Sequence, residues 1–367
     1  MNRITLIKQR IRENNIDALL ITDPSQIFYL VNFTGSSGIL LILPDLVHFF
    51  TDHRYLDLCI RELDKEIQVN IIENSYLDTL AVKCNQLAIK KLAILENYSN
   101  YNTIIELQKR ISSIKIYPVE QKIISLIYQK TEDEIIGLTH SLSIAEQGIE
   151  EIITKLDDIE TELQFYREIQ IQILRKNADE IAFSPIIAWE ANSAYPHHQA
   201  DETIIIGSGK LLIDVGAVYN GFYSDITRMV ILGEPDNYLN KLYDIVKSAK
   251  NYAIESIRPG VKISDVVTKV MEYFTKKGVI KKFLHSLGHG IGRTIHEYPR
   301  LSVDNQMVFE EGYVVTVEPG IYIEGWGGIR IEDTVAVENH GATILNTLND
   351  NPISLQVRTG RRQLVNE

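Results

Sequence analysis

Five side chains that can bind metal ions stand in parts of the sequence where a solvated charge is not expected. Four are acids in or beside apolar runs and the fifth is a histidine between glycines: Asp214, Asp225, His289, Glu318 and Glu332. A lone carboxylate that loses its water must be paired, hydrogen-bonded, protonated or bound to a cation, because its desolvation is otherwise prohibitive. The four acids outnumber the evident basic partners, so the pattern favours metal ions.

The type and number of these ligands indicate two ions rather than one. Carboxylate oxygens with a single imidazole suit manganese, cobalt, iron or zinc. Five protein ligands, including carboxylates that can bridge, are too many for one catalytic zinc, whereas they suit two ions about 3.5–4 Å apart. Each residue alone has a simpler explanation as a cap, a loop residue or a salt bridge. All five in one chain are hard to obtain by accident, and we expect a dinuclear metal site.

The acids lie on β-rich segments in the second half of the chain. Strands are predicted over residues 211–214, 314–318 and 328–336. Side chains two positions apart on a strand share a face, so Arg330 and Glu332 should point the same way. Helices are expected over residues 237–256 and 263–277, with Pro259 and Gly260 between them. This half is therefore an α+β domain whose strands carry the unusual residues.

The first half predicts a separate α/β domain. Ile4, Ile7 and Ile11 recur at helical spacing, a strand follows over residues 17–21, and residues 38–51 predict a buried hairpin. Helix and strand alternate to about residue 118. Two long helices are then expected over residues 123–155 and 161–176. We therefore place the domain boundary near residue 122, giving domains 1–122 and 123–367.

The composition is that of a globular protein, with 45% hydrophobic and 23% charged residues among 367. The net charge of −12 and the lack of a basic face argue against nucleic acid as a partner. Cys59 and Cys84 are expected as buried free thiols rather than a disulfide or a thiolate metal site. No signal sequence or membrane span is predicted, so we expect the cytoplasm. The tail from Gln356 onward is expected to be solvated.

Longer motifs around these residues resemble those of one known family. Residues 211–228, the block HSLGHGIGRTIHEYP over residues 285–299, and VTVEPGIY over residues 315–322 with RIED over residues 330–333 are similar to the pita-bread metallopeptidases. That family includes Xaa-Pro aminopeptidases, prolidases and methionine aminopeptidases. The first half resembles a creatinase-type domain through YLVNFTG at residues 29–35 and TDHRY at residues 51–55. The resemblance implies a creatinase-type α/β domain followed by an α+β pita-bread catalytic domain.

The resemblance also implies a role for each matching residue. The metal ligands would be Asp214, Asp225, His289, Glu318 and Glu332. Asp225 and Glu332 would bridge two divalent ions, expected to be Mn²⁺, with Co²⁺, Zn²⁺ or Fe²⁺ as alternatives. Other residues of the site would be His197 and His296, which contact substrate, His285, a further active-site histidine, and Arg330, which braces the acids. Glu318 would transfer protons, and His296 or His197 would donate to the developing oxyanion.

Some residues near these motifs have simpler interpretations or depart from the family. His198 and His340 are expected at the surface, the latter in a turn. Trp189 and Glu190 stand where relatives commonly have a glycine, and we expect them near the mouth of the site. An Arg-x-x-Lys pattern common near the domain junction is poorly kept around residues 127–130, with no expected consequence.

Together these features predict a metallo-aminopeptidase that removes the first residue from short peptides with proline second. Proline has no N–H, so its site should be apolar. The main alternative is a prolidase, which cleaves only dipeptides, and Arg300 matches an arginine that can bind the free carboxylate there. A binding module without metals and a creatinase are both disfavoured, because the five ligands would be expected to be substituted in either, whereas all five are present here. The family implies a homodimer, and neither nucleic acid nor a membrane is expected as a partner.

Overall fold

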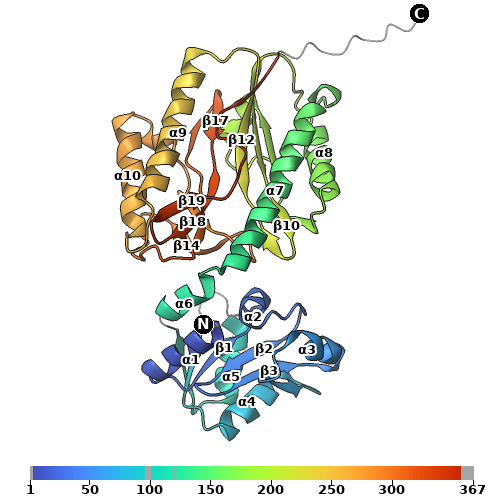
Figure 1. The fold of residues 1–367 in the computed structure, drawn as a ribbon, viewed down its shortest axis with the longest axis vertical. Coiled ribbons are helices and arrows are strands. Elements are labelled where there is room, and N and C mark those ends of the chain that lie inside the picture. Colours follow the sequence, from blue (N-terminus) through green and yellow to red (C-terminus); the bar gives the residue numbers. More distant parts are fainter. Residues whose placement is uncertain (1–2, 96–100, 120, 357–367) are drawn as a thin grey trace, which may run out of the picture. The chain divides into compact units, whose positions relative to one another are not determined.

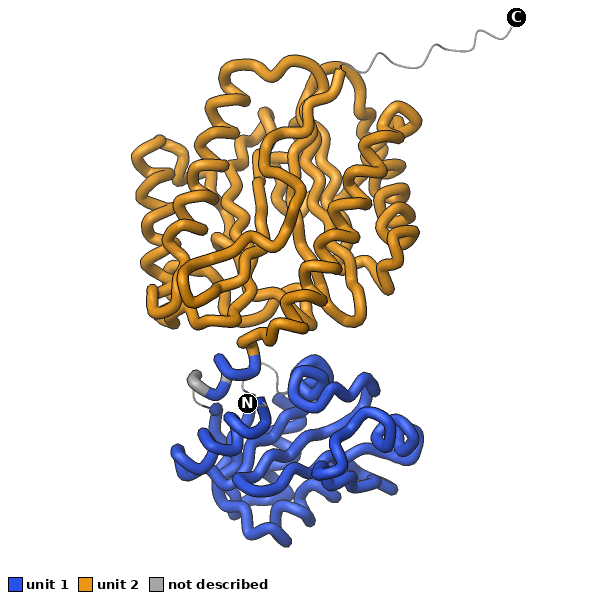
Figure 2. Tube along the Cα trace, in the orientation of Figure 1, with its two compact units in different colours: residues 1–127 blue, residues 128–367 orange. Residues whose placement is uncertain are grey.

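The computed structural model describes residues 3–95, 101–119 and 121–356, and these form two compact units. The units divide between Ile127 and Tyr128 (Figure 2), five residues beyond the end of the first domain expected from the sequence. Of the tail expected to be solvated from Gln356 onward, Gln356 is exposed and residues 357–367 lie outside the described residues. Among the described residues, no helix combines the length and the apolar character that a membrane crossing needs.

The first unit is built on a six-stranded mixed sheet in the order β4-β3-β2-β1-β5-β6 (Figure 1). Its strands are β1 Ala18–Ile21, β2 Ile39–Ile42, β3 Val47–Thr51, β4 Gln68–Ile71, β5 Lys91–Ile94 and β6 Lys115–Pro118. Its helices are α1 Arg3–Glu13, α2 Pro24–Val31, α3 Leu56–Glu62, α4 Tyr76–Gln86 and α5 Tyr101–Arg110, with the short η1 His53–Tyr55. The predicted hairpin is the antiparallel pair β2–β3. Cys59 and Cys84 are free and buried, as expected.

The long helix expected over residues 123–155 is in fact two helices, α6 Gln121–Tyr128 and α7 Glu132–Thr154. Thr131 ends the continuity because it caps α7: its hydroxyl accepts from the Glu134 amide, and the Glu134 carboxylate accepts from the Thr131 amide. Lys130 lies in the break with its side chain buried and forms an ion pair with Glu297. The lysine of this poorly kept pattern is thus present and has a structural role.

In the second unit, strands lie between two pairs of helices, α7 with α8 and α9 with α10 (Figure 1). The further helices are α8 Glu162–Arg175, α9 Asn237–Ser256 and α10 Ile263–Lys276, with η3 Leu156–Asp158, η4 Glu190–Ala194 and η5 Ile280–Lys282. The strands before α9 are β7 Glu180–Ile181, β8 Ile186–Trp189, β9 Gly209–Val215, β10 Ala217–Tyr219, β11 Phe222–Tyr223 and β12 Ile226–Leu232. The strands after α10 are β13 Gly288–Gly290, β14 Glu297–Leu301, β15 Val314–Val317, β16 Gly320–Ile323, β17 Gly327–Arg330, β18 Asp333–Glu338, β19 Gly341–Ile344 and β20 Ile353–Leu355.

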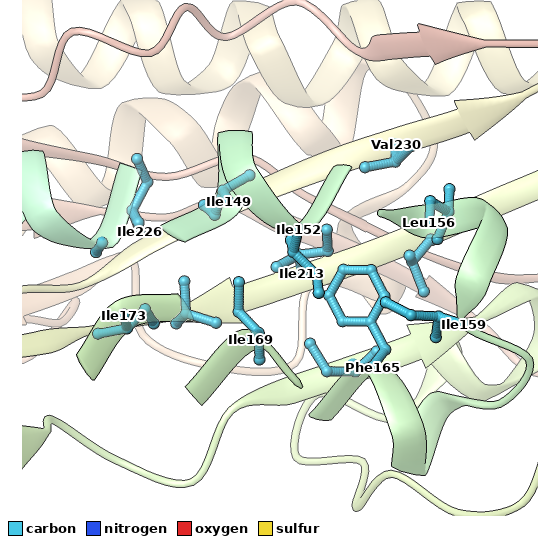
Figure 3. Packing of buried hydrophobic residues seen from close by; sticks show 14 of the residues in the cluster. Ile149, Ile152, Leu156, Ile159, Phe165, Ile169, Ile173, Ile213, Ile226 and Val230 are labelled. Carbon is cyan, nitrogen blue, oxygen red and sulfur yellow. The ribbon is translucent and has the colours of Figure 1, made fainter. Parts of the chain in front are cut away.

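Two sheets of this unit position the site. One has the order β20-β12-β9-β8 and the other the order β14-β13-β15-β18-β19. The helices α7 and α8 bury isoleucines at helical spacing and Phe165 against Ile213, Ile226 and Val230 of β9 and β12 (Figure 3). A central strand covered in this way has no water on that face, so any charge near its end must find its partners inside the protein.

Candidate metal centre

The first sheet supplies two of the predicted ligands, Asp214 and Asp225. Asp214 is the sixth residue of β9, where it pairs with Ile186 of β8 on one side and Thr227 of β12 on the other. Asp225 directly precedes β12, which pairs with β9 so that Ile226 lies opposite Val215. The antiparallel register therefore brings the acids together although eleven residues separate them in the chain. Both side chains are buried.

The second sheet supplies the other three, His289, Glu318 and Glu332. β15 and β18 pair with Val317 opposite Asp333, so Glu318, which follows β15, and Glu332, which precedes β18, leave the same end of the ladder. His289 lies on β13, which joins this sheet through Gly290 opposite Val315. Glu332 was expected inside a strand but lies in the two-residue connection between β17 and β18. Thr227 holds Glu332 in this position. The Glu332 amide donates to the Thr227 carbonyl at 3.3 Å, and the Thr227 hydroxyl donates to the Glu332 carboxylate.

The two sheets bring all five ligands into one cluster. Carboxylate oxygens of Asp214, Asp225 and Glu332 lie within 4.8 Å of one another. The Nε2 atom of His289 lies 3.5 Å from Asp225 Oδ2 and 3.5 Å from Glu318 Oε1. The other ring nitrogen, Nδ1, donates to the carbonyl of Gly290 at 3.0 Å, which leaves the Nε2 lone pair directed at these acids.

The cluster fits cations better than it fits protein partners. Asp214 Oδ1 and Glu332 Oε1 are buried, and no described residue makes a hydrogen bond to either. Burial and the charges of Asp214 and Glu318 raise the pKa of Asp225 well above its usual value. Burial and the charge of Asp225 do the same to the pKa of Glu332, and burial raises that of Glu318. Carboxylates that repel one another in a dry site, with oxygens left over, are what two divalent ions would neutralise.

A chain of hydrogen bonds runs from the acids to His285. Arg330 forms an ion pair with Asp214 Oδ2 and donates from Nη1 to the Tyr322 hydroxyl at 2.8 Å. The Tyr322 hydroxyl lies 2.8 Å from His285 Nε2, and His285 Nδ1 lies 2.7 Å from the carbonyl of Ser286. Since that carbonyl can only accept, Nδ1 carries the proton and Tyr322 donates to Nε2. Arg330 also donates from Nε to Thr227, the partner of Glu332, so both side chains point the same way, as predicted.

His296, His197 and Arg300 are exposed residues. The ring of His296 lies 4.4 Å from that of His289, centroid to centroid. Burial, with the charges of His289, His197 and Arg300, lowers the pKa of His296 to about 4. Burial, with the charges of Arg330 and His197 among other causes, lowers the pKa of His285 to about 4. His197 therefore lies near both histidines, and His285 and His296 are neutral at pH 7.

Comparison with known proteins decides the family. Residues 137–339 match the model of metallopeptidase family M24, and residues 3–126 match the creatinase/prolidase N-terminal domain. The chain belongs to metallopeptidase family M24. The M24 match covers all five residues of the cluster, and the expected pita-bread catalytic domain with a creatinase-type domain before it is confirmed. The chain is therefore a metallopeptidase.

Proteins similar to this chain include a sequence relative and two solved structures. The peptidase YqhT of Bacillus subtilis (strain 168) is 34% identical over 333 residues, which cover 89% of this chain and 92% of that protein. The Xaa-Pro dipeptidase from Bacillus anthracis has a TM-score of 0.88 and 31% identity, covering 96% of this chain and 99% of its own. The X-Pro aminopeptidase from Thermotoga maritima MSB8 has a TM-score of 0.83 and 30% identity, covering 94% and 100%.

Two sequence expectations around the site are wrong. Trp189 does not stand at the mouth: it belongs to β8 and is buried in the core beside Leu211, while Glu190 next to it binds the amide and ammonium groups of Lys210. His198 is not a surface residue, because its ring is 11% exposed and lies 2.6 Å from the buried Glu162. His340 is exposed in a turn, as expected.

Sequence reasoning also missed Tyr322, which links Arg330 to His285. A signal was present: β16 and β17 form a hairpin with Gly320 opposite Arg330, and Tyr322 lies two residues from Gly320 on the same face. A side chain at position 320 would overlap the Tyr322 hydroxyl, so the glycine makes room for the ring. Thr227 gave no such signal, because its contacts with Glu332 and Arg330 depend on how the sheets meet.

Proposed function

We propose that this chain is a dinuclear metal-dependent aminopeptidase that hydrolyses the bond between the first residue of a peptide and a proline at the second position. The observation that carries the proposal is the cluster of these five side chains, in which two buried carboxylate oxygens have no hydrogen-bond partner among the described residues. A donor set of four carboxylates and one imidazole suits Mn²⁺, with Co²⁺, Zn²⁺ or Fe²⁺ as alternatives. When bound, the two ions would supply an activated water and polarise the substrate carbonyl.

The chain's own residues would divide the remaining work. Glu318, whose pKa burial raises, would accept a proton from the attacking water and return it to the leaving nitrogen. His296 or His197, both exposed, would donate a hydrogen bond to the developing oxyanion. Arg330 would hold Asp214 in place through their ion pair.

The position of Arg300 supports a dipeptidase as the second candidate function. It lies on β14 opposite His289 of β13, where its guanidinium would be within range of a free C-terminal carboxylate. Its side chain is exposed, however, and an exposed ion pair contributes only about 0–1 kcal/mol. So weak a contact selects poorly for dipeptides, and for this reason we favour an aminopeptidase that accepts longer peptides.

The test is an assay of the purified chain on Ala-Pro, Ala-Pro-Ala and Ala-Ala-Ala after removal of metal and after addition of Mn²⁺. The proposal expects alanine to be released from Ala-Pro-Ala only with metal, and Ala-Ala-Ala to be cleaved far more slowly. Cleavage of Ala-Pro alone would make the chain a dipeptidase. No cleavage of either proline peptide by protein that holds two ions per chain would refute the proposal.

The proposal includes the setting in which the enzyme works: short peptides as substrates, a homodimer and the cytoplasm. The net charge of −12 supports substrates other than nucleic acid. Light scattering behind a sizing column would test the assembly, because a monomer has a mass of 41.9 kDa.

A further inference from the structure

A second cluster of metal-binding residue types lies outside the metal centre. Ligand atoms of Glu162, His198 and Asp201 also lie within 4.8 Å of one another. Unlike Asp214 and Glu332, Glu162 has hydrogen-bond partners for both carboxylate oxygens, although its side chain is not exposed at all. A buried carboxylate whose acceptor sites are filled by protein has a structural use that requires no ion.

The groups that donate hydrogen bonds to the Glu162 carboxylate come from one segment, residues 189–201, which carries His197. Its Oε1 accepts from the amide of Trp189 at 2.6 Å and from the side chain of Asn192 at 3.0 Å. Its Oε2 accepts from His198 Nε2 at 2.6 Å and from the amide of Asp201 at 3.4 Å. One carboxylate thus binds the segment at four places on both sides of His197.

Glu162 is itself held firmly at the start of α8. The amides of Glu162 and Leu163 donate to the carbonyls of Thr203 and Asp201, at 3.0 and 2.9 Å, and Thr161 caps the helix. A negative charge in the first turn of a helix is favoured by the helix dipole. The carboxylate is therefore a fixed point to which the segment is attached.

The opposite side of the segment is tied to β17, which carries Arg330. Arg330 Nη1 donates to the carbonyl of Pro196 at 3.4 Å, and the amide of Gly328 donates to Ser193 Oγ at 2.7 Å. His197 therefore stands between two residues that are both anchored, Pro196 from the metal-centre side and His198 from α8. Its own ring is exposed.

We propose that Glu162 and His198 are positioning residues, which fix the backbone around His197 so that its ring faces the substrate beside His285 and His296. The inference rests on the proposed function, in which His197 contacts the substrate. His198 Nε2 must donate, because a carboxylate can only accept, and this fixes the tautomer and orientation of its ring. The pair thus acts through His197 and does not touch the reacting groups itself.

The experiment is a double-mutant cycle on the Mn²⁺-loaded protein with Ala-Pro-Ala, using His198→Phe, His197→Ala and the double variant. We expect His198→Phe to lower kcat/KM about 10–100-fold, since small displacements of positioned groups have effects of that size. In the His197→Ala background the same substitution should have little further effect, because the two changes remove one contribution. His198→Gln, whose amide can donate to Glu162, should restore most of the activity. His340→Phe is the matched control, because that histidine is 74% exposed and should not affect the rate.

Two measurements that do not use activity complete the test. Amide hydrogen exchange should quicken over residues 189–201 in His198→Phe and stay unchanged in α9, and metal content should remain that of the unmutated protein. Equal effects of His198→Phe with and without His197, unchanged exchange over the segment, or loss of one metal ion per chain would each overturn the inference. Inactivity of the unmutated protein would refute the proposed function instead. The exchange measurement would still show whether Glu162 and His198 hold the segment in place.

Discussion

The ammonium group of Lys130 lies 2.7 Å from a carboxylate oxygen of Glu297, and neither side chain is exposed to solvent. The other oxygen of Glu297 accepts from the amides of Arg293 and Thr294, at 2.7 and 3.1 Å. These amides belong to the loop that leads into His296. The ion pair therefore joins the first residues of the second unit to a loop of the metal centre.

Replacing Lys130 by methionine should destabilise the protein by about 3–5 kcal/mol, because it leaves the charge of Glu297 buried without its ammonium partner. Urea unfolding followed by circular dichroism measures the change. Adding Glu297→Gln to Lys130→Met removes the uncompensated charge and should recover part of the loss. A single variant within 1 kcal/mol of the unmutated protein would contradict this account of the pair.

Removing metal should lower the melting temperature, because the buried carboxylates of Asp214, Asp225 and Glu332 then repel one another. An ion at 100 times its dissociation constant stabilises by about 2.7 kcal/mol, which corresponds to a shift of roughly 5–10 °C for a unit of this size. Thermal scans with EDTA, and then with increasing Mn²⁺, give the shift. A Tm that does not respond to millimolar Mn²⁺ would argue against a metal centre.

Asp225→Asn should affect the metal-free and metal-loaded protein in opposite ways. Without metal it removes one of the mutually repelling charges, so the free energy of unfolding should rise by about 1 kcal/mol or more. With Mn²⁺ it removes a ligand, so stabilisation by metal and peptidase activity should both be lost. Asp304→Asn, at an exposed acid, is the control. Equal stabilisation of both proteins by Mn²⁺ would rule out Asp225 as a ligand.

Asp350 should contribute to stability at neutral pH and not in strong acid. Burial raises its pKa, but hydrogen bonds and charges of Lys247 and Lys250, each 2.9 Å away, outweigh this and bring the pKa below the usual 3.8. A lowered pKa in the folded state stabilises above the unfolded-state value, and the effect disappears as the pH falls through the folded-state value. Asp350→Asn should therefore lower the free energy of unfolding by about 1 kcal/mol at pH 7. Urea unfolding in EDTA at pH 7 and pH 2.5 should show the difference shrink, and a constant difference would contradict the assignment.

The two cysteines should be unreactive in the native protein. Burial raises the pKa of Cys84 to about 11, and burial with the charge of Glu62 does the same for Cys59. Since the thiolate is the reactive form, a disulfide reagent at pH 8 should label no thiol until denaturant is added, and then two. Rapid labelling of the folded chain would show that one of these sites opens readily.

The sequence predicted those features of the site that depend on neighbouring residues in the chain. Asp214 and Glu318 could be recognised because an acid at the end of an apolar strand has few alternatives to a cation. The strands β9 and β15 and the helix α9 followed from their apolar periodicity. Glu332 was predicted as a ligand and lies in the cluster, but its place outside the strand depends on Thr227, more than a hundred residues away.

The parts that the sequence could not predict depend on pairing across the fold. His198 and Lys130 look like surface residues in a one-dimensional pattern, and each is buried only because a single acid, Glu162 or Glu297, comes from a distant element. The break between α6 and α7 was visible in principle, because Thr131 with Glu134 is a capping box. The apolar periodicity, however, continues on both sides of Thr131 and by itself predicts one helix.

The glycines on either side of His289 let neighbouring backbone segments fix its position directly, without intervening side chains. A methyl group on Gly288 would overlap the carbonyl oxygen of Thr316, and one on Gly290 would overlap that of Tyr298. The backbone therefore contacts neighbouring backbone at the residues directly before and after His289. Gradual replacement of isoleucine by valine or leucine in the surrounding core during evolution would leave this histidine where it is, whereas a single alanine at either glycine would displace it.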